Sequence, residues 1–212
     1  KDALKAKGIV LYPSVSKRNI DLFTVEKDFE TLENSEKIVA GKILTIREHG
    51  KMTFLDIKDH TGKLQIFVRS ENITADYAQN FLGFEDIAFL DIGDYVEISG
   101  TVVKTKTGQI SILAQTIRLL AKSLRPMPSS WDGLEDKETR MRKRYLDTQM
   151  NEDSFQRFIR RSQFWEAHRD FFKAEGFIEM NIPTLEHTTG GADANPFITH
   201  IDTLDEDVYL RI

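Results

Sequence analysis

Hydrophobic and polar residues alternate along residues 38–120 in five short runs, which turn-forming residues separate. Alternation with a period of two is typical of strands that bury one face. The pattern predicts strands over residues 38–47, 52–58, 64–69, 95–104 and 109–119. Gly41 and Gly100 fall inside two of these runs, where a bulge bends a strand and helps a sheet to close.

A polar insert, residues 70–93, separates the third predicted strand from the fourth and contains a short predicted helix at 75–81. Five short strands with an insert at this place are the layout of the OB-fold, a small β-barrel whose outer face binds oligonucleotides. We therefore predict an OB-fold over residues 38–120.

The same alternation predicts which side chains face outward from the barrel. Inward positions on the second, third and fifth strands are Leu55, Ile57, Leu64, Ile66, Val68, Ile110 and Ile112. Outward positions are Phe54, Lys63, Gln65, Phe67, Arg69, Gln109 and Ser111. An outward aromatic ring can stack on an unpaired base, and an amide can hydrogen-bond to the base edge, so this face is predicted to read single-stranded RNA. The alternative is that a loop or a neighbouring domain covers the aromatic side chains.

Two weakly patterned segments flank the predicted barrel. Residues 1–37 are predicted to form a helical arm, and residues 121–150 a linker in which two prolines interrupt regular structure. A charged helix is predicted at 135–145. Its basic run, residues 140–144, either follows an RNA backbone or is a solvated helix face that contacts the next domain.

A second domain is predicted over residues 151–212, which makes the fold class α+β. A long helix begins in this domain and ends at Gly176, and its cap is Asn151, Asp153 or Ser154. The apolar stripe of this helix consists of Phe155, Phe158, Ile159, Trp165, Phe171 and Phe172. Strands are predicted over residues 177–182, closed by Pro183, and over residues 197–201 and 208–212. One helix and three strands cannot close a core, so we expect the chain to be part of a longer protein.

Composition narrows the class of protein. The chain has 40% hydrophobic and 30% charged residues, an ordinary mixture for a soluble globular protein. No apolar run approaches the length of a membrane span, and the absence of cysteine excludes disulfides and fits a reducing cytoplasm. The net charge of −5 argues against a protein that binds duplex DNA mainly through its phosphates. It leaves open the recognition of RNA by stacking, which needs only local positive charge.

The order of these parts resembles a known family. A predicted OB-fold, the phrase from Arg144 to Asp147, a long helix and a strand ending in Pro183 resemble the class II aminoacyl-tRNA synthetases for aspartate, asparagine and lysine. The helix, strand and proline are similar to motif 1, which forms the dimer interface in that family. Within the group, the phrases at 190–200 and 209–211 are similar to lysyl-tRNA synthetases. The resemblance implies that an incomplete class II catalytic domain, an antiparallel sheet with helices, follows the barrel.

The resemblance also implies roles for individual residues of the barrel. Phe54 matches an aromatic residue that stacks on an anticodon base, Gln65 an amide that reads the central uridine, and Arg47 a basic residue near the anticodon. Gln109 stands where bacterial-type members usually carry a glutamate. An amide can still contact a base, but it lacks the charge of the carboxylate.

Further roles are implied for the second domain. Gly190, Gly191 and Ala192 match the loop that lines the lysine pocket, and Pro183 closes motif 1. The expected partners are tRNA, lysine and a second copy of the chain, with neither DNA nor a membrane. The expected location is the cytoplasm.

The reaction implied is the ATP-dependent attachment of lysine to its tRNA. ATP and Mg²⁺ are expected to bind to motifs 2 and 3, which do not occur in the 212 residues, so no catalytic residue or metal ligand is assigned. The five histidines have no metal-ligand spacing; they are His49, His60, His168, His187 and His200. We expect this chain by itself not to form the lysyl-adenylate. Two alternatives stay open, an aspartyl- or asparaginyl-tRNA synthetase and a non-catalytic tRNA-binding protein derived from a synthetase.

Overall fold

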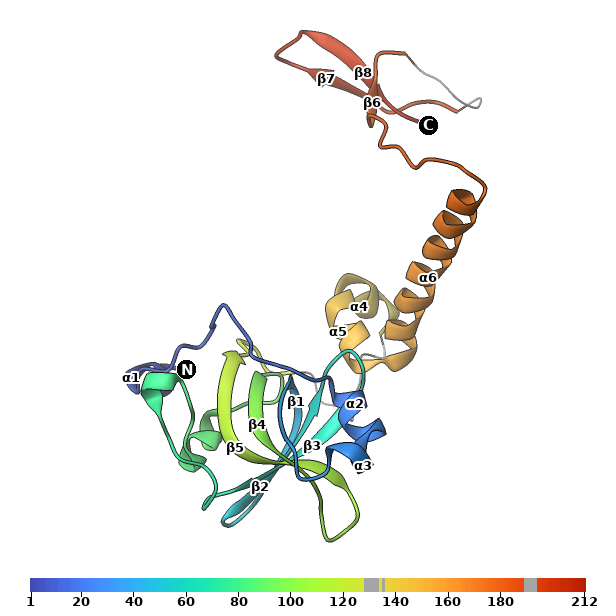
Figure 1. Cartoon of the computed structure of the whole chain (residues 1–212). Helices are drawn as coiled ribbons and strands as arrows, with labels where there is room; N and C mark the ends of the chain where they lie inside the picture. The colour runs from blue at the N-terminus through green and yellow to red at the C-terminus, as the bar shows by residue number, and fades with distance from the viewer. Residues whose placement is uncertain (128–133, 135, 189–193) are drawn as a thin grey trace. The chain divides into compact units, whose positions relative to one another are not determined.

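The structure is a computed structural model that describes residues 1–127, 134, 136–188 and 194–212 (Figure 1). The chain divides into two compact units, Lys1–Ser129 and Ser130–Ile212. In the parts of the chain that the structure describes, no helix has both the length and the apolar character needed to cross a membrane.

Five strands of the first unit form a closed barrel, which confirms the predicted OB-fold. They are β1 (Glu36–His49), β2 (Met52–Lys58), β3 (Lys63–Arg69), β4 (Tyr95–Lys104) and β5 (Ile110–Ala121). Their order around the barrel is β1-β2-β3-β5-β4, and only the β3–β5 pair is parallel (Figure 1). β1 extends two residues beyond each end of its predicted range, because it pairs with both β2 and β4.

A bulge at Gly100 helps the barrel to close. The register between β4 and β5 shifts between Ser99 and Gly100. A Cβ atom at residue 100 would lie 2.2 Å from the backbone oxygen of Leu113, a distance that no side chain tolerates. The register shift confirms the predicted bulge beside Gly100, and the close approach of the neighbouring backbone requires a glycine there.

The barrel core contains six of the seven side chains that the alternation placed inward, and the seventh, Ile110, is partly buried and packs against it. Leu55, Ile57 and Ile66 are fully buried. The same hydrophobic cluster includes buried residues of the N-terminal segment, among them Leu4 and Leu22. That segment contributes three short helices, α1 (Asp2–Ala6), α2 (Leu22–Lys27) and α3 (Phe29–Leu32), which pack on the barrel.

The insert between β3 and β4 differs from its prediction. A helix was predicted over residues 75–81, but the structure has two 3₁₀ turns, η1 (Tyr77–Gln79) and η2 (Phe84–Phe89). The backbones of Asp76 and Phe81 pair with each other in both directions, which competes with helical hydrogen bonding. Asn80 then adopts a φ of 65°, so the chain turns after one helical turn.

The second unit contains three helices and a separate small sheet. The helices are α4 (Lys137–Arg142), α5 (Arg144–Met150) and α6 (Glu152–Ala174). Asn151 caps α6 by accepting hydrogen bonds from two backbone amides, and Gly176 with a φ of 84° follows its end, as predicted. The antiparallel sheet has the order β6-β8-β7, formed by β6 (Leu185–Glu186), β7 (Ile198–Ile201) and β8 (Glu206–Leu210).

The prediction of a strand over residues 177–182 is wrong. These residues form no strand, and apolar side chains within the segment are exposed, Ile178 at 86%. Within the described part of the chain no second strand pairs with this segment, and a β-strand needs a partner for its backbone groups. An apolar run alone therefore did not determine the local structure.

A buried carboxylate connects the three helices. Asp147 accepts hydrogen bonds from Arg140 Nε at 2.7 Å and Arg144 Nη1 at 3.3 Å. Burial acts to raise the pKa of Asp147, but the hydrogen bonds from Arg140 and Ser154 outweigh it and hold this pKa below its usual value. Two arginines of the basic run 140–144 thus have a structural partner within their own unit, which favours the structural alternative for that run.

Candidate nucleic-acid interface

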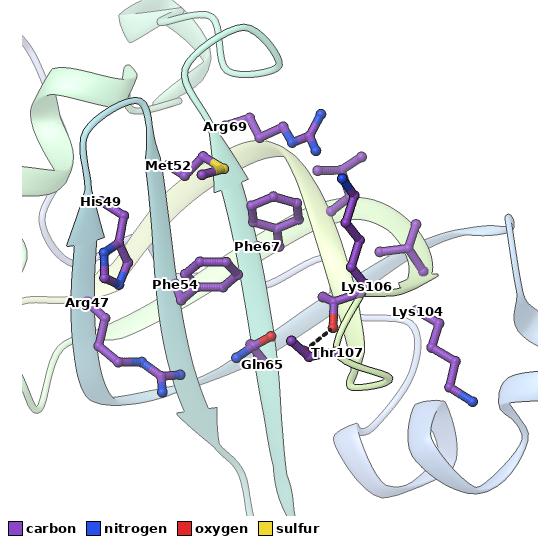
Figure 2. Close-up of a pocket in the computed structure, with 13 residues that line it drawn as sticks. Arg47, His49, Met52, Phe54, Gln65, Phe67, Arg69, Lys104, Lys106 and Thr107 are labelled. Atoms are coloured by element: carbon purple, nitrogen blue, oxygen red, sulfur yellow. Dashed lines mark hydrogen bonds between the residues drawn. The ribbon is translucent and has the colours of Figure 1, made fainter.

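A groove of about 630 Å³ lies on the outer face of β2 and β3, beside the β4–β5 hairpin (Figure 2). Its residues come from β1, β2, β3, β4, β5 and the turn between β4 and β5. They are Arg47, His49, Met52, Phe54, Gln65, Phe67, Arg69, Val103, Lys104, Thr105, Lys106, Thr107 and Leu113. The groove therefore contains four of the predicted outward residues of the second and third strands, Phe54, Gln65, Phe67 and Arg69, and not Lys63.

The floor of the groove is a ladder of flat side chains. Phe54 and Phe67 are direct partners across β2 and β3, and their rings stack with centroids 4.9 Å apart and an angle of 5° between their planes. The His49 ring meets the Phe54 ring edge-on at 6.2 Å, and the guanidinium carbon of Arg69 lies 4.9 Å from the Phe67 centroid. Figure 2 shows these four side chains on β1, β2 and β3. Each partner restricts the rotation of the ring beside it.

Gln65 lies next to the ladder and is largely covered. It is 9% exposed, and its Oε1 accepts a hydrogen bond of 3.0 Å from Ser111 Oγ. Ser111 was predicted to face outward; it lies on that face but is fully buried. The parallel register aligns Gln65 with Ser111, which places both side chains on the same face of the sheet.

Arg47 is held at the edge of the groove by an acid on the next strand. Its Nη2 donates to Asp56 Oδ1 at 3.0 Å and to Oδ2 at 3.1 Å. Thr45 Oγ1 also donates to Asp56, at 2.6 Å. The Arg47 side chain remains about half exposed, so its guanidinium keeps donors for another anionic group.

The β4–β5 hairpin forms the opposite side of the groove. Lys104 and Lys106 belong to it, and its turn is fixed by a 3.0 Å hydrogen bond between the hydroxyls of Thr105 and Thr107. Gln109 follows the turn, is exposed and does not line the groove; its backbone N–H donates to Thr105 Oγ1 at 3.1 Å. The structure therefore brings Arg47, Phe54 and Gln65 together and leaves Gln109 outside the groove.

The charge of the groove is positive. None of its lining residues is acidic, whereas four are basic, Arg47, Arg69, Lys104 and Lys106. Acids just outside the groove pair with the two arginines, Asp56 with Arg47 and Glu71 with Arg69. The apolar floor suits the face of an unpaired base, and the basic rim suits the phosphates on either side of it. Local positive charge thus exists in spite of the net charge of −5.

Eight of the thirteen groove residues were not predicted from the sequence, among them Met52, His49, Lys104 and Lys106. Met52 has the same parity as Phe54 on its strand, so the alternation could have found it. His49 lies at the end of β1, beyond the predicted strand. Lys104 and Lys106 lie at a strand end and in a turn, where no periodic pattern indicates the direction of a side chain.

The remaining predicted site residues belong to the second unit. Gly190, Gly191 and Ala192 lie outside the described residues. Pro183 is exposed and lies two residues before β6. Over the described ranges, no three histidine or acidic side chains are placed to hold a metal ion.

Two families match consecutive parts of the chain. Residues 37–120 match the family described as an OB-fold nucleic acid binding domain. Residues 136–212 match the family described as tRNA synthetases class II (D, K and N). The first match covers the barrel, and the second covers the helices and the small sheet.

Curated bacterial proteins align with nearly the whole chain. It is 41% identical over 216 residues to the lysine–tRNA ligase of Fervidobacterium nodosum, an alignment that covers 100% of the chain and 41% of the relative. It is 42% identical over 217 residues to that of Histophilus somni, covering 99% of the chain and 42% of the relative. The lysine–tRNA ligase of Thermosipho africanus is 40% identical over 215 residues, with 99% and 42% covered. The chain spans about two fifths of the length of these relatives.

Proposed function

Because the chain belongs to the class II tRNA synthetases of the D, K and N group and is similar to lysine–tRNA ligases along its length, we propose that its barrel binds the anticodon of a lysine tRNA. One observation carries the proposal. The stacked rings of Phe54 and Phe67 lie beside the Gln65 amide in a groove with a basic rim. Stacking surface, an amide and cations are the three elements that recognition of unpaired RNA requires.

The groove residues have different roles in binding the anticodon. Phe54 stacks on a base of the anticodon, and Gln65 forms a hydrogen bond with the Watson–Crick edge of the central uridine. Arg47 and the hairpin lysines attract the adjacent phosphates. Gln109 contributes at most a contact from the edge of the site, because it lies outside the groove.

The protein that contains this chain would attach lysine to that tRNA in two steps. The lysine carboxylate attacks the α-phosphate of ATP and displaces pyrophosphate, and the terminal adenosine hydroxyl of the tRNA then takes the lysyl group and releases AMP. ATP and Mg²⁺ follow from the family, and none of the described residues is assigned to them. Gly190, Gly191 and Ala192 are proposed to line the lysine pocket. We also propose that the protein forms a homodimer through the segment that ends at Pro183. Its proposed location is the cytoplasm.

Binding by the barrel is tested with the 212-residue chain and two labelled RNAs, a hairpin with a UUU anticodon loop and a fully paired duplex of equal length. Fluorescence anisotropy measures both dissociation constants at one salt concentration. We expect at least about tenfold tighter binding of the hairpin, because only unpaired bases expose a face for stacking. Equal affinities would overturn the anticodon proposal.

The activity is tested on the protein encoded by the complete reading frame. Charging of tRNA is measured with ATP and with lysine, aspartate or asparagine. We expect charging with lysine alone. Charging with one of the other two amino acids would identify a sister enzyme, and no charging with any of the three would support a non-catalytic tRNA-binding protein.

A further inference from the structure

We propose that Ser111 orients the Gln65 amide so that the barrel selects a base with a carbonyl oxygen on its edge, uracil, against one with an amino group there, cytosine. The inference rests on the proposed function and deepens it. Ser111 is fully buried, so it cannot touch a bound base and must act through Gln65. It is therefore a positioning residue.

A single hydrogen bond determines the direction of the amide. Ser111 Oγ lies 3.0 Å from Gln65 Oε1 and 3.5 Å from the backbone oxygen of Gln109. A hydroxyl has one proton to donate, and the shorter contact is the better hydrogen bond. Ser111 therefore donates its proton to Gln65 Oε1, and the amide oxygen faces the interior of the barrel.

The reversed amide would be less stable. Turning the Gln65 amide by 180° would place its NH₂ group against Ser111 Oγ, which would then have to accept. The serine proton would be left with the Gln109 carbonyl at 3.5 Å, at the limit of hydrogen bonding. The register between β3 and β5, with Gln65 opposite Ser111 and Ile66 opposite Ile112, keeps the two side chains in contact.

The orientation decides what the groove offers to a base. With Oε1 occupied, Gln65 presents its Nε2 group, which has no hydrogen-bond partner among the residues that the structure describes. Uracil carries the O4 acceptor where cytosine carries an N4 amino donor. A donor that faces a donor leaves both groups unpaired, which is costly in a covered site. Gln65 is only 9% exposed, so water can do little to compensate.

The test compares two RNA hairpins that differ in one base, with UUU and UCU in the loop. Fluorescence anisotropy gives the ratio of their dissociation constants for the wild-type chain, Ser111→Ala and Ser111→Thr. We expect the wild type to prefer UUU about tenfold, which corresponds to about 1.4 kcal/mol. Ser111→Ala frees the amide to turn, so its preference should fall to about twofold. Ser111→Thr retains a hydroxyl and should retain the preference.

The ratio of the two dissociation constants distinguishes a positioning role of Ser111 from a loss of folding stability. Any unfolded fraction of Ser111→Ala lowers both apparent affinities equally and leaves the ratio unchanged. If Ser111→Thr does not fold, Gln65→Glu replaces it as the second variant. Its carboxylate accepts only, so we expect its preference to move toward UCU.

Each outcome has one meaning. A wild-type chain that binds neither hairpin contradicts the proposed function. Binding of UUU and UCU with equal affinity by the wild type overturns both the role of Ser111 and the reading of the central uridine by Gln65, and leaves anticodon binding by stacking standing. A tenfold preference that persists in Ser111→Ala overturns the role of Ser111 alone. An unchanged preference for UUU in Gln65→Glu would also overturn it.

Discussion

Phe54 and Phe67 face each other across β2 and β3 with their rings almost parallel, at 4.9 Å and 5°. Neighbouring strands lie about 4.8 Å apart, so a directly opposed pair of rings stacks without distortion of the sheet. The pair exists before any RNA binds. Phe54 therefore loses little rotational freedom on binding, and more of the stacking energy remains as affinity.

Removal of a stacking or base-reading side chain should weaken RNA binding. We expect Phe54→Ala and Gln65→Ala each to cost about 1–3 kcal/mol in binding of the UUU hairpin, the range for the loss of a base–aromatic contact. Fluorescence anisotropy measures the change. Phe23→Ala is the matched control, since Phe23 is 52% exposed and lies outside the groove. Unchanged affinity in both groove variants would remove the assignment.

Charge at the hairpin should appear in the salt dependence of binding. Replacement of Lys104 and Lys106 by glutamine should reduce the slope of log Kd against log salt by about 0.7 for each phosphate contact that is lost. Titrations at several NaCl concentrations give the slope. The double variant of Lys17 and Lys27, two exposed lysines outside the groove, should leave the slope unchanged. A slope equal to that of the wild type in the hairpin variant would show that these lysines contact no phosphate.

Strand alternation predicted the barrel because each strand buries one face, as Leu55 and Ile66 show. It could not predict how far a side chain is covered, which depends on neighbours in space. Ser111 lies on the predicted outer face and is nevertheless fully buried beside Gln65. Segments outside the strands were predicted less well. The apolar residues 177–182 look like a strand, but no strand pairs with them in the described part of the chain.

Gly100 should tolerate no side chain. We expect Gly100→Ala to destabilise the barrel by about 3 kcal/mol, the upper part of the range for overpacking, because the clash is with the backbone of Leu113. Urea unfolding followed by far-UV circular dichroism measures the effect. Gly62→Ala is the control, where the added Cβ would lie 3.8 Å from the nearest atom of Phe23. Equal midpoints for the two variants would contradict the close approach at residue 100.

Asp59 should make the stability of the first unit depend on pH. Its carboxylate accepts hydrogen bonds from the backbone amides of Leu22, at the start of α2, and of Thr61 and Gly62 in the turn before β3. Burial acts to raise the pKa of Asp59, but the Thr61 hydroxyl and these three amides outweigh it and lower this pKa below its usual value. Folding therefore favours the ionised form.

The sign of the effect follows from that lowered pKa. The stabilisation by Asp59 is complete above the pKa of the unfolded chain, about 3.9, and is lost as the pH falls from there through the lower pKa of the folded state. Asp59→Asn keeps an acceptor but lacks the charge, so it should be about 1–2 kcal/mol less stable than the wild type at pH 7. As the pH falls below the pKa of the unfolded chain, the difference should shrink toward zero. Urea unfolding of both proteins from pH 7 to 2.5 measures it, and a difference that stays constant over this range would show that the ionised carboxylate is not the stabilising group.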